Sequence, residues 1–75
     1  MPSDFYQRVL TVCQKHFGDD AQRFLDRQIE SHLSKNADTL LPTDKEELSK
    51  WVKVSASLIM DAATADTITN EIKAL

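Results

Sequence analysis

The chain of 75 residues has only one glycine, two prolines and one cysteine. A single glycine cannot build the glycine-rich loop that holds a nucleotide phosphate, so this class of site is excluded. Cys13 has no second cysteine to pair with, so no internal disulfide can form. The cysteine content fits a reducing compartment, and we expect a cytoplasmic protein.

Long hydrophobic runs are also missing. No stretch approaches the roughly 18 apolar residues of a membrane span. The N-terminal segment lacks the basic start and continuous apolar core of a signal peptide, because Asp4, Gln7 and Arg8 interrupt it. We therefore expect no membrane partner.

Basic residues are in the minority. Nine Lys and Arg residues face twelve Asp and Glu residues, which gives a formal net charge of -3. Nothing basic occurs between Val54 and Ile72. This balance argues against attraction to nucleic acid. A partner of the second half of the chain is expected to be a neutral or basic protein.

The strongest structural signal lies in residues 43–62. Thr43 and Glu46 have the spacing of a helix capping box, and Pro42 stops any preceding helix. The apolar face then recurs at three- and four-residue steps, which predicts an amphipathic helix with this face buried. It consists of Leu48, Trp51, Val52, Ser55, Leu58, Ile59 and Ala62.

Residues before this stretch predict two more helices. Ser3 or Asp4 can cap the first, and Gly18 suits the left-handed residue that follows its last turn. Asn36 is a plausible stop for the second, whose outer face would carry the exposed pairs Arg23–Asp26 and Arg27–Glu30.

A short helix after a break at 61–66, capped by Thr64 or Asp66, completes the pattern. We predict an all-α, single-domain bundle, orthogonal or up-and-down, over residues 1–75. Its four helices cover about 4–17, 20–35, 44–62 and 66–74, with the third central. A bundle of this size buries about 60 to 65% of the surface that the unfolded chain exposes, and a homodimer would bury more.

Part of the central stretch resembles the helix-turn-helix of bacterial and phage repressors. Glu47-Leu48-Ser49 followed by residues 54–59, Val-Ser-Ala-Ser-Leu-Ile, matches the Glu-Leu-Ala and Gly-Val-Ser-x-x-x-Ile elements of that family. The resemblance implies a DNA-binding transcriptional regulator using segment 44–62. Lys53 replaces the turn glycine, however, and residues 55–62 contain no Arg, Lys, Asn or Gln to reach bases or phosphates. A single continuous helix fits the apolar pattern better.

Cys13 and His16 lie one helical turn apart, and His32 follows on the next predicted helix. A thiol with imidazoles can bind a metal or act as a nucleophile with its base. This gives a second alternative, a thiol- or metal-dependent sensor. The simpler interpretation is that all three side chains pack in the interior.

No convergent polar set predicts a reaction, so we expect a non-enzymatic protein-protein interaction or regulatory module without catalytic, cofactor-binding or metal-binding residues. Its partner would be another protein or a second copy of the chain. We expect Trp51 to pack against Phe5, Phe17 or Phe24, or else to be a partly exposed contact for a partner. The candidate partner-binding residues are Trp51, Leu58, Ile59, Leu40 and Leu41.

Overall fold

The computed structural model describes residues 1–75 and is all-helical, as predicted, with 80% of residues in helix and no strand. The α-helices are α1 (Asp4–Phe17), α2 (Ala21–Gln28), α3 (Lys45–Ile59) and α4 (Ala62–Lys73). Short 3₁₀ turns, Gly18–Asp20 and Pro42–Asp44, precede α2 and α3. A π-helical turn, Ile29–Leu33, continues α2. No helix has the length and apolar character needed to cross a membrane.

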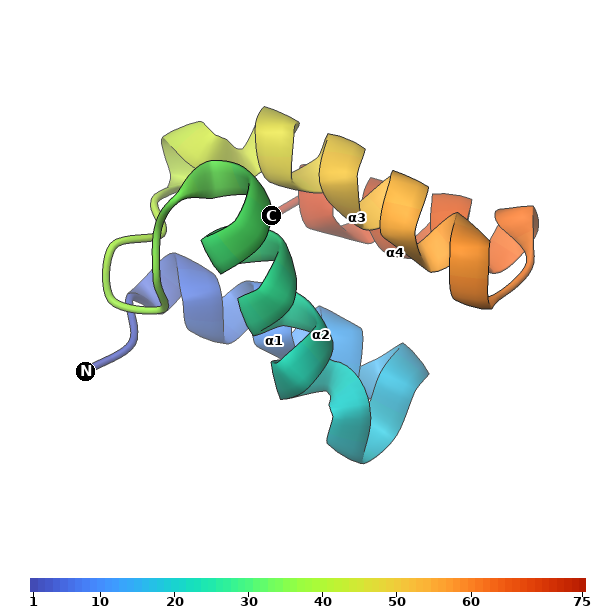
Figure 1. The fold of residues 1–75 in the computed structure, drawn as a ribbon, viewed down its shortest axis with the longest axis horizontal. Helices are drawn as coiled ribbons and strands as arrows, with labels where there is room; N and C mark the ends of the chain where they lie inside the picture. Colours follow the sequence, from blue (N-terminus) through green and yellow to red (C-terminus); the bar gives the residue numbers. More distant parts are fainter.

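The helices form two hairpins that share one core. Figure 1 shows α3 and α4 side by side at the top, with α1 and α2 below them. α4 returns along α3, so that Lys45 Nζ at the start of α3 donates to the carbonyl of Leu75 at 2.8 Å. The core draws on every α-helix, and its fully buried members include Val9, Cys13, Ala21, Leu25, Leu48, Val52, Ile68 and Ile72.

The limits of α1 agree with the predicted range because both ends carry strong local signals. The Ser3 hydroxyl accepts a hydrogen bond from the Tyr6 amide at 3.1 Å, which confirms Ser3 as the cap. Gly18 follows the last turn with φ 64° and ψ −130°. This conformation is open essentially to glycine alone, so the only glycine in the chain stands where the backbone requires it.

The second predicted helix ends earlier than expected. Asn36 was the predicted stop, but helical structure ends at Leu33, and Ser34 takes the left-handed conformation with φ 55°. The Lys35 amide then donates to the Ile29 carbonyl at 3.2 Å, which closes the end of the helix. Asn36 shapes the next turn instead, because its side chain accepts from the amides of Asp38 and Thr39.

Ser34→Gly is expected to raise the free energy of unfolding by about 0.5–1 kcal/mol, because glycine adopts the left-handed conformation without the steric cost of a Cβ. Ser31→Gly, at an exposed position inside the π-helical turn, is the matched control and should lower it by about 1 kcal/mol. Urea unfolding followed by circular dichroism measures both. Equal destabilisation by the two substitutions would contradict the assignment of Ser34 as the terminating residue.

The third predicted helix is shorter at both ends than the range 44–62. At its start the predicted capping box of Thr43 and Glu46 is absent, and the Asp44 carboxylate instead accepts from the Leu41 amide at 2.9 Å. At its end Met60 is extended, and Asp61 caps α4 by accepting from the Thr64 amide at 3.0 Å. Thr64 and Asp66 were therefore wrong as predicted caps. The first amides of a helix have no partner within the helix. The Asp61 carboxylate supplies one, which favours the start of a new helix there over the continuation of α3.

The predicted burial of the apolar face of α3 is correct only for its first part. Leu48 and Val52 are fully buried, and Trp51 and Ser55 are half-buried. Leu58, Ile59 and Ala62 are exposed, so the expectation that the face is sheltered as far as Ala62 was wrong. In Figure 1 the hairpin of α1 and α2 diverges from α3 toward the C-terminal end of that helix, which leaves its last turn uncovered.

Candidate functional site

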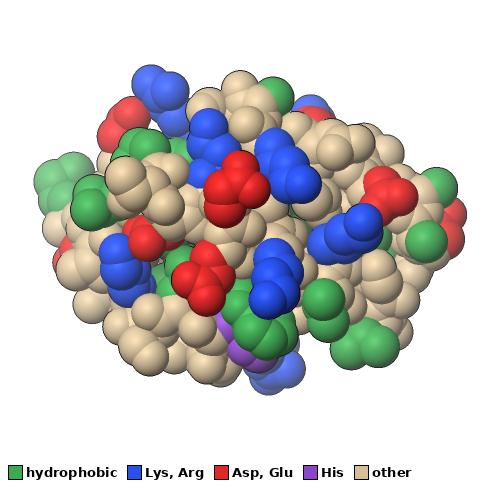
Figure 2. Space-filling model, turned by 90° about the horizontal axis from the view of Figure 1, so that it is seen from above, with side chains coloured by type: hydrophobic (Ala, Val, Ile, Leu, Met, Phe, Trp, Pro, Cys, Tyr) green, Lys and Arg blue, Asp and Glu red, His purple; other side chains and the backbone are tan.

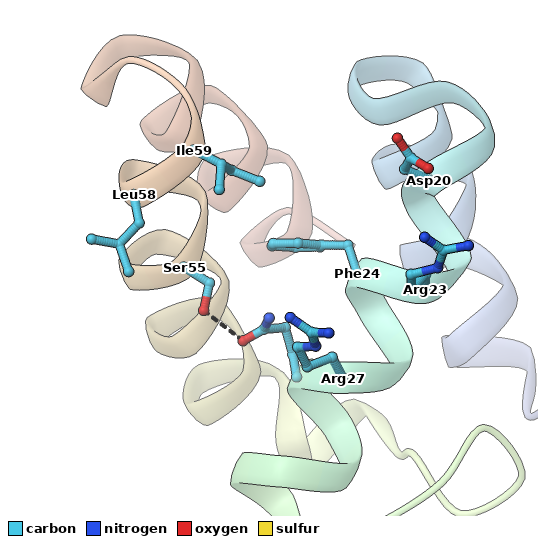
Figure 3. Close-up of a pocket in the computed structure, with 8 residues that line it drawn as sticks. Asp20, Arg23, Phe24, Arg27, Ser55, Leu58 and Ile59 are labelled. Carbon is cyan, nitrogen blue, oxygen red and sulfur yellow. Dashed lines mark hydrogen bonds between the residues drawn. The ribbon is translucent and has the colours of Figure 1, made fainter.

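A groove of about 480 Å³ lies between α2 and the C-terminal half of α3, and we call it the α2–α3 groove. One wall comes from α2 and the turn before it, the other from α3 (Figure 3). It is the only hollow on the surface lined by large apolar side chains. Its lining residues are Asp20, Arg23, Phe24, Arg27, Gln28, Ser55, Leu58 and Ile59.

A hydrogen bond between side chains closes one end of the groove. The Ser55 hydroxyl donates to Gln28 Oε1 at 2.7 Å, as the dashed line in Figure 3 shows. Gln28 is only 3% exposed, so this contact links α2 to α3 in a region with little access to water. The separation of the two helices at this point is therefore fixed by a specific polar contact.

The apolar part of the groove includes the ring of Phe24, which packs against a second aromatic ring. Phe24 points from α2 toward α3 (Figure 3), and its ring stacks on Phe17 of α1 with centroids 4.4 Å apart. From the opposite wall Ile59 projects into the space between the helices, and Leu58 lies on the outer side of α3. Leu58 is 82% exposed and Ile59 64% exposed. The groove thus has an aromatic side chain on its α2 wall and two exposed aliphatic side chains on its α3 side.

Two arginines stand on the α2 wall. Arg23 and Arg27 are one helical turn apart, and neither has a carboxylate within 4.0 Å. The predicted pairs Arg23–Asp26 and Arg27–Glu30 are therefore absent. Asp26 instead accepts a hydrogen bond from the Tyr6 hydroxyl at 2.6 Å. Of the four residues that sequence spacing pairs on the outside of the helix, the two arginines line the groove, Asp26 binds Tyr6 and Glu30 is exposed.

Seen from above, the molecule shows basic and acidic side chains interspersed over its upper face, with separate hydrophobic groups between and beside them (Figure 2). The second hollow, of about 420 Å³ between α3 and α4, has the same mixed character and no hydrophobic lining residue. Lysines and glutamates both line it, so no ligand of one charge is favoured. Its members are Glu46, Glu47, Ser49, Lys50, Lys53, Thr69 and Lys73.

Trp51 packs at a different place from the one predicted. Its ring stacks on His32 of the π-helical turn, with centroids 4.0 Å apart and planes 5° from parallel. Lys50 Nζ lies 5.5 Å from the ring centroid. The expected packing against Phe5, Phe17 or Phe24 was wrong because the π-helical turn presents His32 to the ring. Trp51 therefore joins α3 to the end of the second helical segment and does not line the groove.

The five predicted partner-binding residues do not form one surface. Leu58 and Ile59 lie together on the groove. Leu40 is fully buried in the core, so it has no surface to offer a partner. Leu41 is 50% exposed but precedes the N-terminal end of α3, at the opposite end of the helix from Ile59. Of the predicted set, only Leu58 and Ile59 therefore belong to the candidate site.

The structure gives Cys13, His16 and His32 separate environments. Burial of Cys13 raises the pKa of its thiol to about 12, so this side chain is a neutral core residue at pH 7. His16 Nε2 lies 2.8 Å from Glu71 Oε1, and hydrogen bonds from Lys15 and His16 hold the pKa of Glu71 below its usual value. No group of three or more His, Cys, Asp or Glu side chains is placed to hold a metal ion. The three residues form no shared site.

Sequence reasoning missed the α2 wall of the groove. The apolar pattern assigns Phe24 to the core, and it assigns the arginines beside it to a solvated face. No feature of the sequence places these residues opposite Leu58 and Ile59, because that arrangement depends on the crossing of α2 and α3. The observation that α3 is continuous from Lys45 to Ile59 also removes the turn that the helix-turn-helix interpretation requires at Lys53.

A scan against protein-family models, and searches among curated proteins and solved structures, give no match.

Proposed function

We propose that the protein is a non-enzymatic interaction module that binds another protein through the α2–α3 groove. The supporting observation is the position of Leu58 and Ile59, two consecutive aliphatic side chains that are 82% and 64% exposed on the groove wall. Exposed apolar side chains that meet in a concave surface are typical of recognition sites.

The apolar pattern of α3 gives the physical reason. Leu48, Val52 and Ala56 bury one stripe of this helix against the core of the chain. Leu58 and Ile59 prolong the apolar surface past the region that the other helices cover. Removing apolar surface from water is favourable by about 25 cal/mol per Å², so a partner that covers these two side chains gains binding energy.

The polar groups of the groove support binding over catalysis. Its only hydroxyl, that of Ser55, donates to Gln28 and has no base beside it. Its only carboxylate belongs to Asp20, and it contains no histidine or cysteine. A nucleophile or general base needs a partner that activates it, and none of these side chains has one.

Leu58→Asp is expected to abolish partner binding without unfolding the protein, because it places a charge at the exposed outer edge of the groove. Immobilised wild-type protein is compared with this variant for proteins retained from a lysate of the source cells, with quantification by mass spectrometry. Retention of the partner should fall by at least about tenfold, which corresponds to about 1.4 kcal/mol.

Val54→Asp is the matched control. Val54 is 48% exposed on the same helix but does not line the groove, so the same chemical change there should leave partner retention unaltered. Circular dichroism verifies that both variants are folded. If wild type, Leu58→Asp and Val54→Asp retain the same proteins in equal amounts, the groove is not the binding site and the proposal is wrong.

A further inference from the structure

We infer that the occupant of the α2–α3 groove is an acidic amphipathic helix of a partner protein. This inference rests on the proposed function and adds the chemistry of the partner. It combines three observations: two arginines without ion pairs, their spacing on α2, and the uncovered aliphatic side chains across the groove from them.

The charge of the groove is opposite to that of the chain. The whole chain carries a formal net charge of -3, whereas two arginines and one aspartate line the groove. The third arginine, Arg8, is paired with Asp4 at 3.1 Å, so the two arginines without a carboxylate partner are the two on the groove. A partner that supplies carboxylates would complete the interactions that this chain leaves open.

The spacing of the arginines indicates the form of those carboxylates. Arg23 and Arg27 are four residues apart on α2, which corresponds to a rise of about 6 Å along the helix axis. Two acidic side chains four residues apart on a second helix have the same spacing. Each guanidinium can bind a carboxylate through two parallel hydrogen bonds. A helix lying along α2 can therefore satisfy both arginines at once.

The α3 wall of the groove indicates which side chains of the occupant lie next to its acidic residues. Ile59 projects into the groove and Leu58 extends its outer edge (Figure 3), so the occupant must present apolar side chains next to its acidic edge. A helix seated in an apolar groove buries residues at steps of three and four. The resulting occupant has an apolar stripe of leucine-like residues flanked on one side by Glu or Asp at positions i and i+4.

A second copy of this chain does not meet that description. The large apolar side chains exposed on its helices, Val54, Leu58 and Ile59, all belong to α3. The acidic residues of α3, Glu46 and Glu47, lie in its first turn, at the opposite end from Leu58. A copy that docked this end of α3 into the groove would therefore keep Glu46 and Glu47 away from the arginines, and the acid nearest to Ile59 in sequence, Asp61, already accepts a hydrogen bond from the Thr64 amide as the cap of α4.

Synthetic helical peptides of about 18 residues test the inference, since this length gives about five helical turns. The first peptide carries a leucine stripe flanked by Glu at i and i+4, and the second has Lys in place of each Glu. Fluorescence anisotropy with labelled peptides measures their affinity for the wild-type chain. The acidic peptide is expected to bind at least about tenfold more tightly than the basic one at low salt, with the difference shrinking as salt screens the charges.

Charge reversal on the protein supplies the matched experiment. In the double variant Arg23→Glu and Arg27→Glu, the preference should reverse, so that the basic peptide binds more tightly. Arg8→Glu, an equal change at an exposed position of α1 outside the groove, should leave the preference for the acidic peptide intact. The Leu58→Asp variant should bind neither peptide.

Equal affinity of the acidic and basic peptides would overturn the inference, and so would the absence of binding by both. The proposed function would survive either result if Leu58→Asp still lost its partner from the lysate while Val54→Asp kept it. A dimer in sedimentation equilibrium that Leu58→Asp dissociates would show a second copy in the groove and would also overturn the inference. If Leu58→Asp retained every protein that the wild type retains, the proposed function itself would fail.

Discussion

Leu48→Ala is expected to lower the free energy of unfolding by about 2–5 kcal/mol, whereas Leu58→Ala should change it by less than about 0.5 kcal/mol. Both substitutions remove the same atoms from the same helix. Leu48 is fully buried between α3 and the rest of the core, so its truncation leaves a cavity as well as lost apolar contact. Leu58 is 82% exposed, so its truncation removes atoms that already meet water.

Urea unfolding monitored by circular dichroism measures the difference. A domain of this size has a total stability of only about 4–11 kcal/mol, so Leu48→Ala can leave a population of unfolded chains before urea is added. Leu48→Met preserves the volume of the side chain and should cost less than about 1.5 kcal/mol, which keeps the comparison measurable. Leu58→Ala should unfold at the same urea concentration as the wild type at every protein concentration tested.

Equal destabilisation by Leu48→Ala and Leu58→Ala would contradict the division of α3 into a buried and an uncovered part. A midpoint difference between the wild type and Leu58→Ala that grows with protein concentration would contradict it as well, because Leu58 of the wild type would then be buried between chains. Either result would remove the exposed apolar surface on which the α2–α3 groove depends.

The parts of the fold that sequence predicted well are those set by neighbouring residues. The range of α1 follows from the Ser3 hydroxyl at one end and the positive φ of Gly18 at the other, and both depend only on local backbone geometry. The all-helical class follows from apolar residues at steps of three and four. The stop at Ser34 was not predictable in this way, because serine has no strong preference for the left-handed conformation that it adopts.

The candidate site was predictable only on the α3 side. The apolar pattern identifies Leu58 and Ile59, but their exposure depends on where α2 diverges from α3, which no local signal encodes. Spacing on α2 pairs Arg23 with Asp26, yet Tyr6 from α1 takes that carboxylate. The net charge of the chain also fails to predict the site, because a chain with a formal net charge of -3 can still place two arginines without ion pairs on one groove.

Raising the pH above 9 is expected to destabilise the fold through Cys13. Its ordinary pKa of 9.0 rises to about 12 because burial disfavours the thiolate. Between these values the folded chain keeps a proton that the unfolded chain has lost, so stability is fully present below pH 9 and falls as the pH rises. The full difference corresponds to about 4 kcal/mol, and about 3 kcal/mol of it should be lost by pH 11.

Tyr6 acts in the same direction from about pH 10, since burial and the hydrogen bond to Asp26 raise the pKa of its hydroxyl. Urea unfolding at a series of pH values from 7 to about 11 measures the combined loss. Cys13→Ala should be less stable than the wild type at pH 7 but should lose less stability on going to pH 11, and Tyr6→Phe should remove the part that begins near pH 10. Thiol titration gives an independent check, because a buried neutral thiol should react only as fast as the chain unfolds.

A wild-type stability that stays constant up to pH 11, or a Cys13→Ala variant with the same pH dependence as the wild type, would contradict the burial of an un-ionised thiol at the centre of α1.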